Sequence, residues 1–187
     1  MEPDIAGPAL VLGSVRGRRS FCVLPDGRLT GVFFPQVWQP GENRASCFHD
    51  GGVVVREPDG RLAVRGYSVR DIGAAHGLQG CTCGFYAYYR ADPYARPRRV
   101  SGIIEGYGRV VLGTKGFRAQ KARLVALVLP EELPGSENAP TDAVPADGRL
   151  APGDGARVRE RYPDVAVFPR EEAMVVAFPP TEDGPTL

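Results

Sequence analysis

The stretch 100–129, VSGIIEGYGRVVLGTKGFRAQKARLVALVL, decides the fold. Two runs rich in β-branched and other apolar residues, 99–113 and 117–129, predict strands, and Gly113 and Gly116 bracket a turn between them. Glycine inside a strand marks a bulge, sharp coiling or the close approach of another backbone. Glycines 102, 106 and 108 share a parity and therefore face one way in a regular strand. This pattern is typical of a small curled sheet or barrel.

Shorter elements surround this segment. The turn 25–27, Pro-Asp-Gly, joins predicted strands 21–24 and 29–34, and Pro-Asp-Gly at 58–60 joins strands 53–56 and 62–65. Another strand is predicted at 44–48 and a short helix at 92–93. The C-terminal part predicts a short helix at 156–162, a strand at 165–168 and a helical turn at 170–175. We expect an α+β fold that is mostly antiparallel β: a small curled sheet or partial barrel with a few short helices.

The composition of the chain suggests one domain with looser ends. A β-rich core domain is predicted at 20–129, preceded by an N-terminal arm at 1–19. Residues 130–155 contain six acids, many Pro and Gly and no aromatic residue, so they predict a flexible acidic loop. Residues 156–178 predict a helix–strand segment that packs on the core, and 179–187 a disordered tail.

Length and charge exclude several classes of protein. With 187 residues and 43% hydrophobic content, the chain can bury a core without disulfides. A net charge of +1 predicts no global attraction to nucleic acid or membrane, and no apolar run reaches the roughly 20 residues of a membrane-spanning helix. The N-terminus places acids before its apolar stretch, the reverse of a secretory signal, so we expect a cytoplasmic protein. The preference for arginine over lysine suggests a GC-rich bacterial genome.

One set of motifs resembles a known family. The order DGRL, VW-x-PGEN-x-A-x-C, H-x4-C-x-CGFYA, GRVV, KGFRAQKARLVAL and RYPDV is similar to a family of actinobacterial proteins without an assigned activity. In that family a Trp-x-Pro-Gly…Cys segment precedes a Cys-x-Cys-Gly-[Ile/Phe]-Tyr-Ala block and a Gly-Phe-Arg-Ala segment. The resemblance covers roughly residues 20–129 and, more weakly, 157–168. It implies the extent of the domain and no activity.

The cysteines suggest a metal site. Cys81 and Cys83 lie in a glycine-bounded turn, and a cytoplasmic setting favours thiols or metal ligands over disulfides. Together with Cys47 and His76 they would make a Cys3His set, the composition of a closed structural zinc site, with His49 as the reserve fourth ligand. The alternatives are buried thiols without a ligand, a catalytic cysteine and a redox pair.

A local excess of positive charge suggests a second site. Residues 90–123 contain nine Arg or Lys residues against Asp92 and Glu105, interleaved with aromatic residues. Basic groups beside aromatic rings are typical of surfaces that bind single-stranded nucleic acid. The alternative is a solvated face, or one neutralised by the acidic loop. The candidate polyanion-binding residues are Arg96, Arg98, Arg99, Arg109, Arg118, Lys121 and Arg123.

A third pattern is similar to the central part of ADP-ribosyltransferase domains. There, a Gly-x-Tyr-[Phe/Ala] strand contributes a tyrosine that stacks beside nicotinamide. The resemblance implies that Tyr86 is this tyrosine, that Glu105 is a catalytic carboxylate, and that His76 belongs to the upstream His-Gly pair of an NAD-dependent enzyme. The alternative is that Tyr86 is an ordinary aromatic residue of the sheet.

The sequence therefore favours a non-enzymatic binding or accessory module, with a structural zinc as its cofactor. Its ligand is not determined by any motif, and the partner is a protein or a polyanion. An NAD-dependent enzyme with an ADP-ribosyltransferase-like core, and a binder of single-stranded nucleic acid, are the alternatives.

Overall fold

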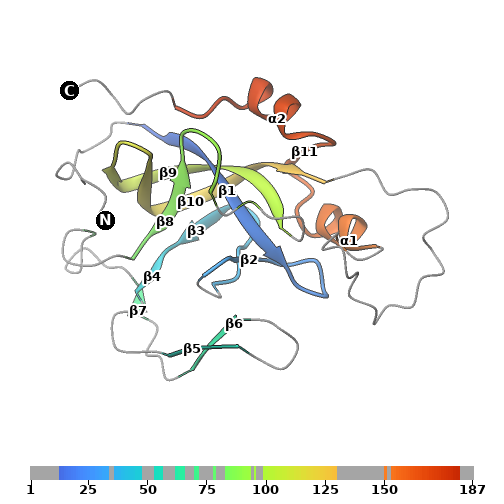
Figure 1. Ribbon diagram of the computed structural model, residues 1–187, viewed down its shortest axis with the longest axis horizontal. Coiled ribbons are helices and arrows are strands. Elements are labelled where there is room, and N and C mark those ends of the chain that lie inside the picture. Colours follow the sequence, from blue (N-terminus) through green and yellow to red (C-terminus); the bar gives the residue numbers. More distant parts are fainter. Residues whose placement is uncertain are drawn as a thin grey trace.

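The computed structural model of the chain describes residues 13–33, 36–47, 53–56, 62–65, 70–71, 78, 83–93, 95, 99–129, 150 and 153–181. These residues form eleven strands and two short helices (Figure 1). In chain order the elements are β1 Val15–Val23, β2 Leu29–Gly31, β3 Glu42–Arg44, β4 Ser46–Cys47, β5 Val53–Arg56, β6 Leu62–Arg65, β7 Arg70–Asp71, β8 Phe85–Tyr88, β9 Val100–Leu112, β10 Gly116–Val128, α1 Asp154–Arg161, β11 Ala166–Phe168 and α2 Glu171–Ala177. Neither described helix is long and apolar enough to cross a membrane.

The hairpin of β9 and β10 is the centre of the fold. The two strands run antiparallel, and the N–H of Gly113 donates to the carbonyl of Gly116 at 2.8 Å, which confirms the predicted turn. The register shifts between Ala119 and Lys121 and again between Leu124 and Ala126. Such irregularities bend a strand and increase its twist, so they explain why this hairpin curls.

The neighbouring strands extend the curl. β1 pairs with the free edge of β9, β8 pairs with β10, and β8 also pairs with β1 at Arg18 and Tyr88. Following these pairings from β1 to β9, β10 and β8 therefore leads back to β1. Figure 1 shows β8 lying across the curled hairpin. The prediction of a mostly antiparallel, curled sheet with a few short helices is confirmed. Among the strand pairs of the described residues, only that of β11 with β10 is parallel.

The strand glycines explain how the backbones come so close. A Cβ at Gly102 would lie 2.7 Å from the carbonyl oxygen of Ala126, and one at Gly106 would overlap the ring of Phe117. Gly108 differs, although the sequence grouped it with these two. Its φ is +76°, and it lies opposite the register shift, so the regular alternation of the strand ends before it. Its role is conformational, whereas Gly102 and Gly106 allow close packing.

The sheet is covered on both faces. Ile103 and Ile104 are adjacent in β9 and point to opposite faces, yet both are fully buried. Ile104 belongs to the main core inside the curl, whereas Ile103 packs with Ala126 and Met174 against α2. Beside them, the Phe168 and Phe178 rings meet edge to face with centroids 5.9 Å apart. The C-terminal segment thus closes the outer face.

Some element boundaries differ from those predicted. β1 begins at Val15 rather than at 21, because its edge pairs with β9 along seven residues from Val15 to Phe21. The predicted strand 44–48 is divided into β3 and β4, with Ala45 between them. Helix α1 begins at Asp154, two residues early, after Gly153 in a left-handed conformation. Residues 92, 93 and 95 are described and are not helical. The strands 53–56 and 62–65 are confirmed.

Candidate functional site

Two distant segments meet on one short stretch of β10. The guanidinium of Arg118 is 7% exposed and donates to the backbone carbonyls of Leu78 and Cys83. Two residues after Arg118 in β10, the carbonyl of Gln120 accepts a hydrogen bond from the N–H of Ala45 at 2.8 Å. The segment that leads into β4 and the segment that leads into β8 are therefore anchored on neighbouring residues of one strand.

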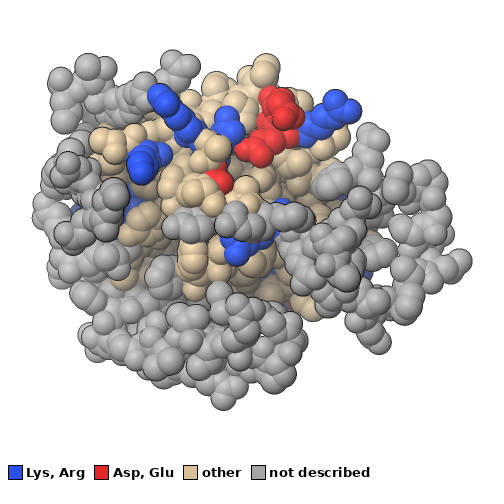
Figure 2. Space-filling view, in the orientation of Figure 1, with Lys and Arg blue, Asp and Glu red and all other residues tan. Residues whose placement is uncertain are grey.

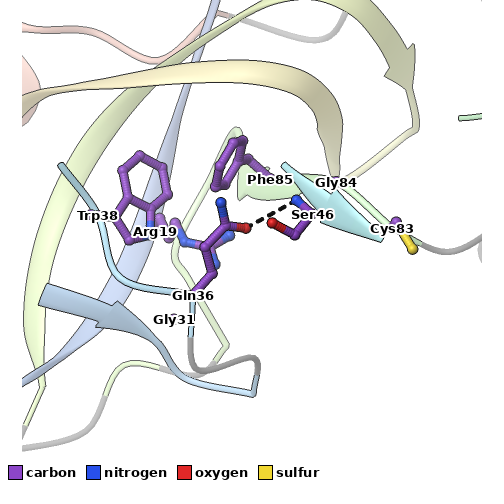
Figure 3. A pocket seen from close by; sticks show the side chains of 8 residues that line it. All are labelled: Arg19, Gly31, Gln36, Trp38, Ser46, Cys83, Gly84 and Phe85. Carbon is purple, nitrogen blue, oxygen red and sulfur yellow. Dashed lines mark hydrogen bonds between the residues drawn. The ribbon is translucent and has the colours of Figure 1, made fainter. Parts of the chain in front are cut away.

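A small pocket lies where these segments meet (Figure 3). Its cavity volume is about 20 Å³, close to the space that one water molecule needs. Strands β1, β2, β4 and β8 and the loops beside them contribute its wall. The lining residues are Arg19, Gly31, Gln36, Trp38, Ser46, Cys83, Gly84 and Phe85.

Arg19 is the charged group of this pocket. Its Nη1 donates to the carbonyl of Tyr86 at 2.6 Å, and the guanidinium carbon lies 5.4 Å from the centre of the Trp38 ring. Burial lowers the pKa of Arg19 to about 10, and the charge of Asp92 offsets only part of that effect. Its Nε is buried and has no hydrogen-bond acceptor among the described residues. A cation is thus held mainly by one carbonyl and aromatic faces.

Trp38 provides the second unsatisfied donor. Its side chain is 1% exposed and packs against the rings of Phe21 and Phe85, whose centroids lie 5.2 Å and 4.6 Å away. The hydroxyl of Tyr162 donates to the Trp38 carbonyl at 2.8 Å and fixes its backbone. The indole Nε1 is buried and, within the described part of the chain, meets no acceptor. Buried donors of this kind normally have a partner, and in this pocket two of them lie side by side without one among the described residues.

Gln36 holds the rim of the pocket in place. Its side-chain oxygen accepts a hydrogen bond from the N–H of Ser46 at 3.2 Å, which is the dashed line in Figure 3. Its side-chain nitrogen donates to the carbonyl of Arg44 at 2.5 Å. The two ends of the amide therefore bind the end of β3 and the start of β4. The pocket as a whole presents donors on a fixed wall, an arrangement that can bind a group rich in acceptors.

The proposed zinc ligands lie mostly outside the described residues. Cys83 is buried and lines the pocket, and Cys47 ends β4, although its side chain is not described. His49, His76 and Cys81 are outside the described ranges. Among the residues that are described, no three His, Cys, Asp or Glu side chains are grouped to hold a metal ion. The Cys3His set therefore stays a prediction.

The residues implied by the ADP-ribosyltransferase resemblance lie on different strands. Tyr86 of β8 pairs with Arg118, whereas Glu105 of β9 pairs with Arg123, five residues further along β10. Five strand residues span roughly 16 Å. The pocket described above is lined by neither residue, and His76 is outside the described ranges. A site that combines the three residues stays a prediction.

Glu105 itself is enclosed by partners. Its carboxylate accepts hydrogen bonds from Ser14 Oγ and from Arg123 Nε, each at 2.5 Å, and Arg16 Nε lies 3.6 Å away. Burial alone would raise the pKa of Glu105. The two hydrogen bonds and the charges of Arg123 and Arg16 outweigh burial and hold that pKa below its usual value.

The candidate polyanion-binding residues divide into three groups. Arg118 is buried, and Lys121 and Arg123 form ion pairs with Glu42 and Glu105 at 3.2 Å and 2.5 Å. Arg99 is half-buried and Arg109 is exposed, whereas Arg96 and Arg98 lie outside the described ranges. On the face in Figure 2, the described basic side chains are scattered, and some of them lie beside acidic ones. Binding of nucleic acid by this region stays a prediction.

Sequence reasoning missed Arg19, Trp38 and Gln36 as site residues. One signal for Arg19 was present, because residues two apart in a strand face the same way. Arg19 shares a parity with Gly17 and Phe21, both buried, so an arginine on the core face could have been noticed. Comparison with models of protein families, with curated proteins and with solved structures finds no match.

Proposed function

We propose that this protein is a non-enzymatic binding module that takes the polar end of its ligand into the Arg19 pocket. The observation that carries the proposal is the half-buried guanidinium of Arg19, whose Nη1 donates to one carbonyl at 2.6 Å. Its buried Nε and the buried indole N–H of Trp38 beside it both lack an acceptor among the described residues. Burying charge and unsatisfied donors costs free energy. Residues that reduce stability in this way are typical of binding sites, where a ligand supplies the missing partners.

Binding fits this pocket better than catalysis. A nucleophilic mechanism requires a base in hydrogen-bond reach of the nucleophile and a group that orients the base. The lining residues present a guanidinium, an amide that is already engaged, a hydroxyl and one thiol. These groups recognise and orient a ligand. The cytoplasmic location expected from the sequence is part of this proposal, and Cys22 is a free thiol.

The experiment tests whether the poorly compensated charge of Arg19 lowers the free energy of unfolding. Replacing it by methionine keeps an unbranched side chain and removes the charge. We expect Arg19→Met to raise the free energy of unfolding by about 1 kcal/mol, because replacing poorly compensated buried charge by apolar groups is often stabilising. Urea denaturation measures the change. Arg109→Met, at an exposed position of the same sheet, is the matched control. A loss of stability in Arg19→Met beyond that of the control would mean that Arg19 is structural.

A structural zinc is the second part of the proposal. It is supported by the position of Cys83, which lines the same pocket as Ser46 although the two are far apart in sequence. Ser46 is the neighbour of Cys47, another proposed ligand. Thiolate ligands favour zinc over hard cations. Elemental analysis of protein purified without chelator should find stoichiometric zinc, and Cys83→Ser should lose it. Cys22→Ser should retain the metal, since Cys22 lies in β1 and is not in the proposed set. Wild-type protein without zinc would contradict this part alone.

A further inference from the structure

We infer that the Arg19 pocket binds a single carboxylate group. This inference rests on the proposed function and names the chemical class of the ligand. It follows from three properties of the pocket, namely the donors on its wall, the charge within it and its volume.

The donors suit a flat acceptor with two oxygens. A guanidinium presents its N–H groups as a planar fork that matches the two oxygens of a carboxylate. In Arg19, Nη1 donates to the carbonyl of Tyr86, whereas the buried Nε has no acceptor among the described residues. Figure 3 shows Arg19 beside Trp38, whose indole Nε1 is a further donor without an acceptor in the described part of the chain. A carboxylate can accept about four hydrogen bonds, and both unsatisfied donors need one.

The charge of the pocket favours a monoanion. Among the described residues that line it, Arg19 is the only basic one, and the charge of Asp92 offsets only part of the effect of its desolvation. A carboxylate carries one negative charge and neutralises the guanidinium. A phosphate carries about −1.5 to −2 charges at neutral pH, so it would leave an excess negative charge buried. A neutral amide would satisfy a donor but would leave the cation uncompensated.

The size of the pocket limits what enters. A volume of about 20 Å³ holds little more than a water molecule, so only the head of a ligand can lie inside. The backbone at Gly31 and Gly84 forms part of the wall, and Gly84 has a φ of +132°, a conformation that favours glycine. The remainder of the ligand lies outside. It is either a small carboxylic acid or the terminal carboxylate of a peptide.

Trp38 gives a direct readout, because it is the only tryptophan in the chain. In ¹H–¹⁵N spectra of the full chain its indole N–H therefore gives one resonance. Sodium acetate, acetamide and inorganic phosphate are titrated separately at constant ionic strength. We expect acetate to move this resonance downfield in a saturable way. Acetamide should have no such effect, and phosphate should bind at least about tenfold more weakly.

Variants separate a specific site from a general charge effect. Arg19→Gln should weaken acetate binding at least about tenfold, since it removes a charge-assisted hydrogen bond, whereas Arg109→Gln removes one exposed charge and should leave binding unchanged. N-acetylglycylglycine distinguishes the two sources. Binding tighter than that of acetate assigns a peptide terminus, and equal or weaker binding assigns a small acid.

The outcomes distinguish this inference from the proposed function. If phosphate or acetamide moves the resonance as strongly as acetate, the carboxylate assignment is wrong but the pocket still binds a ligand. If Arg109→Gln weakens acetate binding as much as Arg19→Gln does, the effect is general electrostatics and the assignment is also wrong. If none of the probes moves the resonance, both the assignment and the proposed binding site fail.

Discussion

Two charges lie in or beside strand β1, the half-buried Arg19 and the buried Glu105, and their surroundings differ. At one end Arg16 pairs in register with Glu105, whose side chain is 5% exposed and has three polar partners. Three residues further along, Arg19 has one carbonyl acceptor, aromatic neighbours and a pocket. The pKa shifts express the same contrast. Partners hold the pKa of Glu105 low and so favour its charged form, whereas burial lowers the pKa of Arg19 and disfavours its charged form.

This contrast separates structure from function. Removing one partner of a compensated buried charge is strongly destabilising, because the other charge is left uncompensated. A desolvated charge with few partners reduces stability, and we propose that a ligand explains its retention. The ADP-ribosyltransferase resemblance implies Glu105 as a catalytic carboxylate, yet its charge is compensated by neighbouring groups. Arg19, which no motif indicated, has a charge with little compensation.

The largest effect should come from Glu105→Gln. The variant keeps the shape of the side chain but removes the charge that Arg123 and Arg16 neutralise. We expect the free energy of unfolding to fall by about 2 kcal/mol, the scale of hydrogen bonds to a charged group. Urea denaturation at neutral pH measures it. A variant as stable as the wild type would show that the charge of Glu105 is not structural and would contradict the contrast with Arg19.

Acid should reduce the stability that Glu105 contributes. Its folded-state pKa lies below that of the unfolded chain, about 4.3. The contribution is therefore complete above that unfolded-state pKa, and it is lost as the pH falls through the folded-state pKa. We expect the difference between wild type and Glu105→Gln to be constant from pH 7 to about pH 5 and to shrink below about pH 4. Denaturation series of both proteins across this range give the comparison. If the stability difference between the two proteins grew as the pH fell, the folded-state pKa of Glu105 would lie above its unfolded-state pKa, contrary to this prediction.

The sequence predicted those parts of the fold that depend on local patterns. Gly113 and Gly116 located the central turn because a hairpin is made by neighbouring residues. The turn at Pro25, Asp26 and Gly27 was likewise predictable. Gly27 has a φ of +80°, and its N–H donates to the Leu24 carbonyl at 2.9 Å. The curl of the sheet was predicted from the glycines within strands. The separate role of Gly108 was not, because it depends on a register shift that no local pattern encodes.

The pocket could not be predicted in this way. It depends on Arg19 and Ser46 meeting Cys83, and these residues are brought together by the pairing of β1 with β9 and by the anchoring of two segments on β10. Long-range pairings of this kind have no signature at a fixed spacing. Arg19 was also hidden by its residue type, because arginine is usually exposed and the sequence placed it in an arm. Charge counting then drew attention to residues 90–123, where Lys121 and Arg123 form ion pairs.

The smallest effect should come from Glu42→Gln, which tests whether burial is what distinguishes Glu105. Glu42 resembles Glu105 in its partners, since Lys121 lies 3.2 Å away and the Tyr107 hydroxyl donates to it at 3.1 Å. The hydrogen bond from Lys121 is the main reason that the pKa of Glu42 lies below its usual value. Its side chain, however, is 43% exposed. Water screens exposed pairs, and many of them contribute nothing measurable to stability. We therefore expect the urea midpoint of Glu42→Gln to match that of the wild type, in both low and high salt. A loss as large as that of Glu105→Gln would mean that the number of partners, and not burial, determines which charges of this sheet are structural.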